Sequence, residues 1–374
     1  MQPGETGTFV YANPRTIHWG AGVLAKRLAN ELEQRGLHRT FVISTRSVAA
    51  NPELGGRLRD LLGDRLVGEY GAIGQHAPAA SVAEAVERAR EAQPDVLVSF
   101  GGGSPIDAAK SVAFALATGL DVADPAAAET ARRFHPRPSD LVTQIAIPTT
   151  LSAAELSGLA GFTTETEHEK VGLRGEALIP ACVIFDAELS LQTPLDLWLS
   201  TGIRAVDHAV ETVLAPGSHP FQDTLALEAL RRLRSSLRAT RRDPTDLHVR
   251  TESQLGAWFS FTLPGPAASG LSHTLGKRIG SRHGIPHGVS SCLLLPHVMR
   301  YLEPRAPEPL ARIAAALDAA CAADAVASLI LELGLPQHLG AYALSESDLV
   351  SAARPVASEA YPLQDLVGIY RAAL

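Results

Sequence analysis

The sequence predicts an α/β domain with a mainly parallel sheet, Rossmann-like in organisation, followed by an all-helical second domain. In the first half, short apolar runs rich in β-branched residues alternate with helical patterns, an order typical of a parallel sheet covered by helices. Three consecutive glycines at 101–103 join one expected strand to the next helix. After about residue 193 the β-branched runs stop, and the remaining patterns are helical.

The first half contains an ordered series of strands and helices. Gly36 is expected to end the first helix. Ser81 and Glu84 have the spacing of a capping box that would begin a second helix, and Pro94 would end that helix. The expected elements are helices at 24–36, 81–93 and 105–117, and strands at 39–44, 95–100, 144–147 and 182–185.

The second half reads as helices separated by short breaks. Thr193 and Pro194 supply a cap and a first-turn proline. The expected helices lie at 194–214, 221–239, 246–262, 266–280, 287–301, 307–333 and 346–356. Since 374 residues exceed what one core usually serves, we expect a dinucleotide-binding domain over 1–192 and a helical catalytic domain over 193–374. The active site is expected in the cleft between them.

Composition excludes several classes of partner. A net charge of −7 argues against nucleic-acid binding, and the arginine cluster within 231–242 has the spacing of a solvated helix face. No apolar run approaches the roughly 18 residues of a membrane span, and no export signal is readable. Three scattered cysteines, Cys182, Cys292 and Cys321, fit a reducing compartment, so we expect a cytoplasmic protein.

The glycine run is the strongest functional motif. Without Cβ atoms, Gly101, Gly102 and Gly103 let backbone N–H groups approach a diphosphate, and the following helix N-terminus adds unpaired donors and a positive dipole end. A bare glycine turn is often only structural. The strand before it and the helix after it favour a phosphate cradle.

Three histidines stand out in the helical half. His208, His273 and His287 each lie in a segment that contains or borders glycine. A lone helical histidine is more often a packed or surface residue than a ligand, but three in such segments favour a common site.

Four motifs together resemble the iron-containing (group III) alcohol dehydrogenase family. They are GGGSPIDAAK at 101–110, IPTT at 147–150, the helix around His208, and the segment from His273 to Gly288. The resemblance implies a dehydroquinate synthase-like architecture, a homodimer, and a divalent metal held by one Asp and three His. The Asp of the family lies one helical turn before the first His, and the second and third His are fourteen residues apart, as His273 and His287 are.

Two residues depart from the family pattern. Arg204 stands where the metal-binding Asp is expected, and Lys277 stands where many members have another histidine. The adjacent Asp207 points about 100° away from His208 around a helix, so it is a poor substitute ligand. Because a guanidinium keeps its proton, we expect no metal, with Arg204 and Lys277 taking over its electrostatic role.

The segment 148–155 is similar to that of maleylacetate reductases, the branch that reduces an unsaturated oxo diacid and has a relaxed metal requirement. The resemblance implies hydride transfer from NADH or NADPH to the carbonyl or conjugated enone of a small carboxylate substrate. The expected catalytic residues are Arg204, His208, His273, Lys277 and His287. His287 or His273 is the expected proton donor, and the two cations suit a substrate carboxylate.

The expected cofactor residues lie in the first half. They are Thr45, Gly101, Gly102, Gly103, Ser104, Asp107, Thr149, Thr150 and Ser152. The glycines and Ser104 would hold the diphosphate, while Thr149, Thr150 and Ser152 border the nicotinamide. Thr45, and not a carboxylate, follows the strand expected at 39–44. Without a negative charge there to repel the 2′-phosphate of NADPH, either NADH or NADPH fits. Asp107 could instead be only a favourable early helix charge, and Lys110 a solvent-facing residue.

Three alternatives remain open at this stage. In the first, His208, His273 and His287 bind Zn or Fe in a metal-dependent alcohol dehydrogenase. In the second, the chain is a non-redox biosynthetic enzyme like dehydroquinate synthase, which uses bound NAD for other chemistry. In the third, it is an inactive scaffold.

Overall fold

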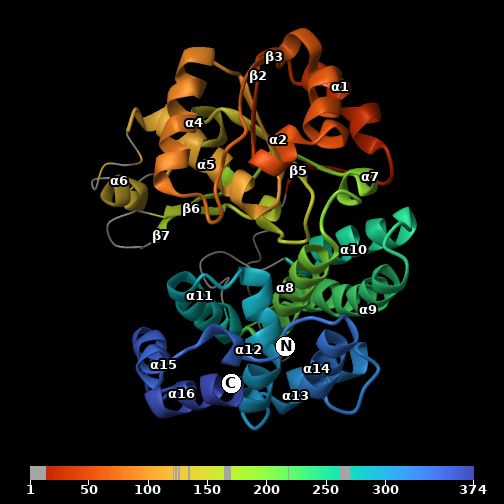
Figure 1. Cartoon of the computed structure of the whole chain (residues 1–374), viewed down its shortest axis with the longest axis vertical. Coiled ribbons are helices and arrows are strands. Elements are labelled where there is room, and N and C mark those ends of the chain that lie inside the picture. Colours follow the sequence, from red (N-terminus) through yellow and green to blue (C-terminus); the bar gives the residue numbers. More distant parts are fainter. Residues whose placement is uncertain are drawn as a thin grey trace, which may run out of the picture. The chain divides into compact units, whose positions relative to one another are not determined.

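The computed structural model describes residues 14–374 apart from residues 121, 123, 125–126, 134, 164–169, 218 and 262–269. The chain divides into two compact units (Figure 1). Among the described residues, the sheet unit comprises Pro14–Gly202 and Ser235–Ala257, and the helical unit comprises Ile203–Arg234 and Trp258–Leu374. The division therefore falls within helix α8 (Leu195–Leu214), ten residues after the boundary expected at 192/193.

The sheet unit contains a six-stranded, entirely parallel sheet with the order β1-β8-β5-β4-β2-β3. Its strands are β1 (Thr16–Trp19), β2 (Thr40–Ser44), β3 (Leu66–Tyr70), β4 (Val96–Gly101), β5 (Thr143–Pro148) and β8 (Cys182–Phe185). The predicted α/β class is confirmed. The sequence did not reveal β1 and β3, which are the two edge strands and are mostly half-buried, so their residues lack the continuous apolar pattern of the central strands.

Helices cover both faces of this sheet. Helices α4 (Ala79–Ala92) and α5 (Gly103–Thr118) pack on the face that receives Phe41 and Ile43 of β2. Helices α1 (Val23–Gln34) and α3 (Arg57–Leu62) pack on the opposite face with Val42. Figure 1 shows α4 and α5 on the side of the sheet opposite α1. This alternation of side chains along one strand explains why the central strands are apolar throughout.

Several smaller elements complete the sheet unit. They are α2 (Arg46–Ala50), α6 (Ala127–Arg133), α7 (Ala187–Ser190), α10 (Leu247–Ser260), and the antiparallel pair β6 (Leu159–Thr163) and β7 (Lys170–Arg174). The capping box expected at Ser81 is wrong. Helix α4 begins two residues earlier, after Pro78, and the Ser81 hydroxyl donates to the Pro78 carbonyl at 2.9 Å.

The helical unit follows the predicted order of helices closely. Its members are the later part of α8, the first part of α9 (Pro220–Arg242), and α11 (Leu271–His283), α12 (His287–Leu302), α13 (Pro307–Ala316), α14 (Ala322–Glu332), α15 (Glu346–Ala353) and α16 (Leu363–Ala372). The single helix expected over 307–333 is wrong, because Asp318 adopts a left-handed conformation with φ of 51° and separates α13 from α14. The start of the helix expected at 266 lies outside the described residues.

One core holds α11, α12, α15 and α16 together. Leu275, Ile279, Leu293 and Tyr370 are buried in it, and the Tyr370 hydroxyl donates to the Leu275 carbonyl at 2.8 Å. Across the described ranges, no helix has the length and apolar content that would let it cross a bilayer.

Candidate functional site

The predicted cofactor residues of the sheet unit lie along one edge of the sheet. Strands β5, β4 and β2 are neighbours and run parallel, so their carboxyl ends share an edge. The glycine run follows β4, the Thr149–Ser152 segment follows β5, and Thr45 follows β2. Ligands of open α/β sheets bind beyond this edge, so the topology brings together residues more than 100 positions apart in the sequence.

The glycine turn has the backbone that a phosphate cradle needs. Gly101 has φ of +133°, a region that residues with side chains rarely adopt. Gly102 is the N-cap of α5, and Gly103 is its first residue. Helix α5 is buried along most of its length, so its N-terminus is held firmly against the sheet. The turn therefore presents a fixed helix N-terminus with no Cβ to obstruct it.

Two hydroxyls after β5 lie directly beside this turn. A Cβ on Gly102 would stand 3.3 Å from Thr150 Cγ2, and one on Gly103 would stand 3.2 Å from Ser152 Oγ. The Thr150 and Ser152 hydroxyls are buried and have no hydrogen-bond partner within the described protein. Buried polar groups in proteins are usually paired, so these two oxygens indicate a ligand or ordered water. Both observations fit the cofactor position predicted for them.

The other predicted cofactor residues have mixed surroundings. The Ser104 hydroxyl accepts the His76 backbone N–H at 3.0 Å. Thr149 donates its N–H to the Gly101 carbonyl at 2.9 Å, which ties the two loops together. Thr45 is the N-cap of the short helix α2, and Asp107 lies in the second turn of α5, half-buried. Thr149 and Ser104 therefore shape the loops by contacts within the protein.

Lys110 and Glu155 form a buried pair of charged residues in the sheet unit, and the sequence did not predict their burial. Lys110 is buried, and its ammonium donates to the carbonyls of Ala154, Ser157 and Leu159 at 2.7, 2.7 and 2.9 Å. The solvent-facing alternative for Lys110 is therefore wrong. Glu155 is fully buried, and neither of its carboxyl oxygens has a hydrogen-bond partner in the described protein. Burial raises the pKa of Glu155 to about 7, although Lys110 acts in the opposite direction.

In the helical unit, two of the predicted imidazoles meet. His208 on α8 and His273 on α11 stack with ring centroids 4.7 Å apart and an interplanar angle of 16°. Phe261 meets the His208 ring edge-on at a centroid distance of 4.6 Å. Both histidines are buried, with 3% of each residue exposed. The structure thus brings together two residues that are 65 positions apart in the sequence.

Two carboxylates hold His273 in place. Glu211 Oε2 lies 2.7 Å from His273 Nδ1, and Asp207 Oδ2 lies 3.3 Å from the same nitrogen. Glu211 also accepts the backbone N–H groups of His273 at 3.0 Å and Gly270 at 2.8 Å. A Cβ on Gly270 would stand 2.4 Å from the Glu211 carboxyl carbon, so the approach requires glycine there.

Asp207 is anchored by hydroxyls from two further helix positions. Its Oδ2 accepts from Ser272 on α11 at 2.9 Å and from Ser291 on α12 at 2.7 Å. Asp207 and His208 point in different directions around α8, but both belong to the same group of side chains, because His273 contacts Asp207 and stacks on His208. We call Asp207, His208, Glu211 and His273 the histidine–carboxylate cluster.

The two imidazoles have opposite electrostatic environments. Burial, followed by the charges of His273, Arg204 and Lys277, holds the pKa of His208 well below its ordinary value. Burial also acts to lower the pKa of His273, but the carboxylates of Asp207 and Glu211 outweigh it and raise that pKa. A neutral imidazole therefore stacks on one that favours its proton, a division that suits acid–base chemistry.

The remaining predicted catalytic residues surround this cluster. Arg204 is half-buried one turn before His208 on α8, and Lys277 is exposed one turn after His273 on α11. Both influence the pKa of His208. His287 is the first residue of α12, and it shares a helix face with Ser291, four residues later.

The cluster does not match the family's metal site. His273 Nε2, His208 Nδ1 and Asp207 Oδ1 are buried without a hydrogen-bond partner in the described protein, which is compatible with a ligand. Asp207, Glu211 and His273 also have donor atoms within 4.8 Å of one another. However, Glu211 is committed to two backbone N–H groups and to His273, and a guanidinium stands at the position of the anionic ligand. Arg204 and Lys277 add positive charge close to these donor atoms.

Asp207 and Glu211 were not among the predicted site residues. They are spaced four apart on the buried side of α8, flanked by Val206, Ala209 and Val210. The sequence signal for them is the presence of two carboxylates on an otherwise apolar helix face. Because buried charges are almost always paired, such carboxylates indicate nearby partners.

Comparisons with known proteins agree with this architecture. The family profile described as "Iron-containing alcohol dehydrogenase" matches residues 14–187, and that described as "Fe-containing alcohol dehydrogenase family, C-terminal" matches residues 198–369. A maleylacetate reductase from Rhizobium sp. is 31% identical over 363 residues, which cover 96% of this chain and 93% of that protein. A maleylacetate reductase from Sphingobium indicum is 30% identical over 358 residues, covering 95% and 92%.

A solved structure is similar over the whole chain as well. The crystal structure of a maleylacetate reductase from Agrobacterium tumefaciens has a TM-score of 0.82 to this chain, at 29% identity, with 99% of each chain covered.

Proposed function

Since this chain belongs to the iron-containing alcohol dehydrogenase family of oxidoreductases, we propose that it is an NAD(P)H-dependent, metal-independent reductase of a small oxo acid. The observation that carries the proposal is the histidine–carboxylate cluster, in which Glu211 and Asp207 contact His273 and raise its pKa, and His273 stacks on His208, whose pKa is lowered. The similarity to maleylacetate reductases supports an unsaturated oxo diacid as the substrate class.

The sheet unit supplies the cofactor half of the proposal. Gly101, Gly102 and Gly103 would receive the diphosphate at the N-terminus of α5, and the buried hydroxyls of Thr150 and Ser152 would bond the nicotinamide half. When bound, NAD(P)H supplies a hydride. The backbone of the turn and these hydroxyls bind and orient it.

The helical unit supplies the proton and the charge. Hydride addition to the carbonyl or to a conjugated enone would place negative charge on the carbonyl oxygen, and a preorganised donor there would lower the barrier. His273 donates its Nε2 proton to that oxygen, while Asp207 and Glu211 stabilise the imidazolium through Nδ1. A bound NAD(P)H would supply the hydride and His273 the proton of the reduced product, and the neutral His273 would regain its proton from solvent.

Arg204 and Lys277 would bind the substrate carboxylates. A guanidinium can contact a carboxylate through two parallel hydrogen bonds, and this geometry favours oxo acids over simple alcohols. Burial, the charge of His273 and these two cations together lower the pKa of His208, so His273 is the better acid of the pair.

A coupled assay tests the proposal directly. The purified protein is mixed with NADH or NADPH and with maleylacetate, other oxo acids or simple aldehydes, and cofactor absorbance is followed with and without a chelator. We expect oxo-acid turnover that the chelator leaves unchanged. About one transition metal per chain, with activity lost on its removal, would overturn the metal-independent assignment. Product formation without net cofactor consumption would point to non-redox chemistry.

A further inference from the structure

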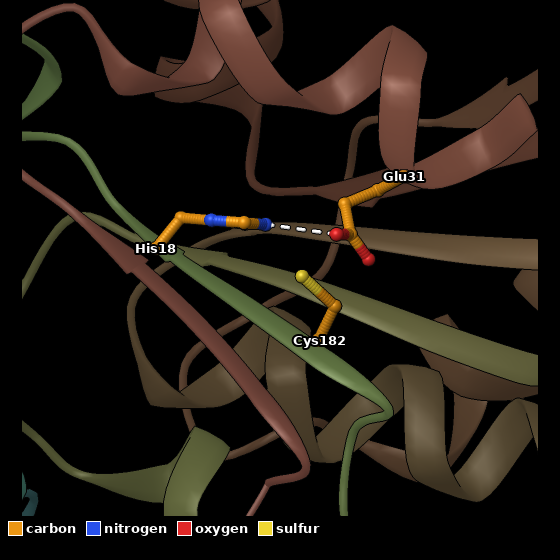
Figure 2. Close-up of side chains that lie close together, drawn as sticks. All are labelled: His18, Glu31 and Cys182. Carbon is orange, nitrogen blue, oxygen red and sulfur yellow. Dashed lines mark hydrogen bonds and ion pairs between the residues drawn. The ribbon is translucent and has the colours of Figure 1, made fainter. Parts of the chain in front are cut away.

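A second cluster of metal-binding side chains lies in the sheet unit, away from the residues of the proposed reaction. It consists of His18 on β1, Glu31 on α1 and Cys182 on β8, and Figure 2 shows the three side chains pointing toward one another. One donor atom from each, the imidazole nitrogen, the carboxylate oxygen and the sulfur, lies within 4.8 Å of the others.

We propose that His18, Glu31 and Cys182 form a binding site for zinc or a similar thiophilic divalent ion. Zinc takes nitrogen, oxygen and sulfur ligands with bonds of about 2.0–2.3 Å, which places neighbouring ligand atoms of a tetrahedral site about 3.5 Å apart. The three donors lie within 4.8 Å of one another, and His18 Nε2 is 2.9 Å from Glu31 Oε1, so their present spacing is close to that distance. A thiolate and an imidazole select zinc over magnesium or calcium, which prefer oxygen ligands only.

The scaffold under these ligands is rigid. Strands β1 and β8 are hydrogen-bonded neighbours, with Thr16 beside Cys182 and His18 beside Ile184. Helix α1 is tied to the end of β8 because Asp186 accepts the backbone N–H groups of Gly22 and Leu24, both at 2.9 Å. The three ligands therefore come from elements whose mutual positions are already set, as a metal site requires.

Glu31 is oriented for one metal bond. Its Oε2 accepts from the Arg35 guanidinium at 3.0 Å, and Arg35 also donates to the Thr16 hydroxyl at 3.1 Å. The other oxygen, Oε1, is 2.9 Å from His18 Nε2. Arg35 can keep its contact while Oε1 binds the ion, and such outer contacts commonly orient metal-binding carboxylates.

The exchange of protons is balanced. In the metal-free cluster, His18 Nε2 lies 2.9 Å from Glu31 Oε1 and, when it carries the imidazole proton, donates it to that oxygen, while Cys182 is a buried thiol. On binding, the ion replaces the hydrogen between Nε2 and Oε1, and the neutral imidazole carries its proton on Nδ1. The thiol releases one proton to solvent.

An entry route for the ion exists at His18. Its side chain is 20% exposed, whereas Glu31 is 8% exposed and Cys182 is buried. Water can complete the coordination from this side. Cys182 is the first residue of β8, so the cluster reaches the amino-terminal edge of the sheet, whereas the proposed cofactor residues lie at the carboxyl-terminal edge.

Cobalt substitution tests the assignment, because a thiolate bound to Co²⁺ gives an intense near-ultraviolet charge-transfer band. The full-length protein, stripped of metal, is titrated with Co²⁺ and then with Zn²⁺ in competition. We expect the band to appear with one equivalent of Co²⁺, to vanish in Cys182→Ser, and to persist in the control Cys321→Ser. Zinc should raise the Tm of the wild type and of Cys321→Ser but not of Cys182→Ser.

His18→Gln keeps the proposal testable if Cys182→Ser folds poorly. Glutamine can still donate to Glu31, so packing is retained, while a metal ligand is lost. We expect its zinc Kd to rise at least about tenfold, with the exposed control His38→Gln unchanged, and we expect oxo-acid turnover of His18→Gln to equal that of the wild type. A wild type without the thiolate band, or a band and a zinc Kd that neither His18→Gln nor Cys182→Ser changes, would overturn the site.

Discussion

The two candidate halves of the reaction are built in contrasting ways. At the sheet edge, the candidate binding groups are backbone and small hydroxyls, as at Gly101 with its φ of +133° and at Ser152, whose oxygen has no hydrogen-bond partner in the described protein. In the helical unit, the chemistry rests on long charged side chains from separate helices, as where Glu211 meets His273 at 2.7 Å. We therefore expect side-chain substitutions at the sheet edge to have smaller effects on activity than substitutions of the charged residues in the helical unit.

The largest expected effect lies in the histidine–carboxylate cluster. In His273→Gln the proton donor is missing, so kcat for oxo-acid reduction should fall by roughly 10²- to 10⁴-fold while the Kd of NADH stays near the wild-type value. Stopped-flow reduction and fluorescence titration of NADH measure the two quantities. Equal turnover of the wild type and this variant would remove His273 from the mechanism.

The next effect concerns stability in the sheet unit. Folding raises the pKa of Glu155 from 4.5 to about 7, so the folded state holds a proton that the unfolded state has released. The carboxyl therefore costs stability as pH rises from about 4.5, and the cost levels off above about pH 7, at about 3 kcal/mol.

Glu155→Gln removes this dependence. Urea unfolding of both proteins at pH 5 and pH 9 should show the variant gaining about 3 kcal/mol over the wild type at the higher pH. Lys110 and Asp107, the charged neighbours, are present in both proteins and make the comparison matched. A difference that does not change with pH would contradict the burial argument.

Arg204→Asp tests charge recognition by the helical unit. Loss of a charge-assisted contact of about 1.5–3 kcal/mol predicts a fall of about 10- to 100-fold in kcat/KM for oxo diacids. Uncharged aldehydes should be affected less, and metal analysis should be repeated because the variant restores an anionic side chain one turn before His208. An unchanged kcat/KM without metal would refute the role given to Arg204.

Glu211→Gln should produce a smaller change, visible in the pH profile. The carboxylate helps to raise the pKa of His273, whose protonated form is the active one, so activity falls as pH rises through that pKa. Removing the charge should move this basic limb to lower pH. A limb at the same pH in both proteins would show that another group titrates.

The smallest effect is expected for Ser152→Ala at the sheet edge. One neutral hydrogen bond is worth about 0.5–1.5 kcal/mol, so the Kd of NADH should rise about two- to tenfold. The exposed Ser139→Ala serves as the control in the same titration. A Kd equal to that of the wild type would place the hydroxyl outside the cofactor site.

The same contrast explains what the sequence could predict. The phosphate turn is local, because the strand, the three glycines and the helix are contiguous, and the structure has them in that form. The central strands were readable because both faces are buried. The edge strand β1 was not, because its half-exposed side chains lack a continuous apolar run.

The cluster around His273 depended on contacts that no local pattern encodes. Its histidines are identifiable from their motifs, but helix geometry alone argues against Asp207 as a metal ligand, and no motif marks Glu211. Their roles follow from the packing of α8 against α11 and α12, which places Ser272, Ser291 and His273 around the two carboxylates. Likewise, three carbonyls from residues 154–159 accept hydrogen bonds from the Lys110 ammonium, and no sequence pattern indicates that loop conformation.

The enclosure of Lys110 constrains how this protein can diverge. An apolar residue at 110 would leave three carbonyls without the hydrogen bonds that Lys110 donates, and would remove the positive charge that lowers the pKa of Glu155. A substitution at position 110 alone should therefore destabilise the fold, so related proteins should change residue 110 only together with residue 155. Among distant sequences of the lineage, we expect residues 110 and 155 to covary as one heritable pair.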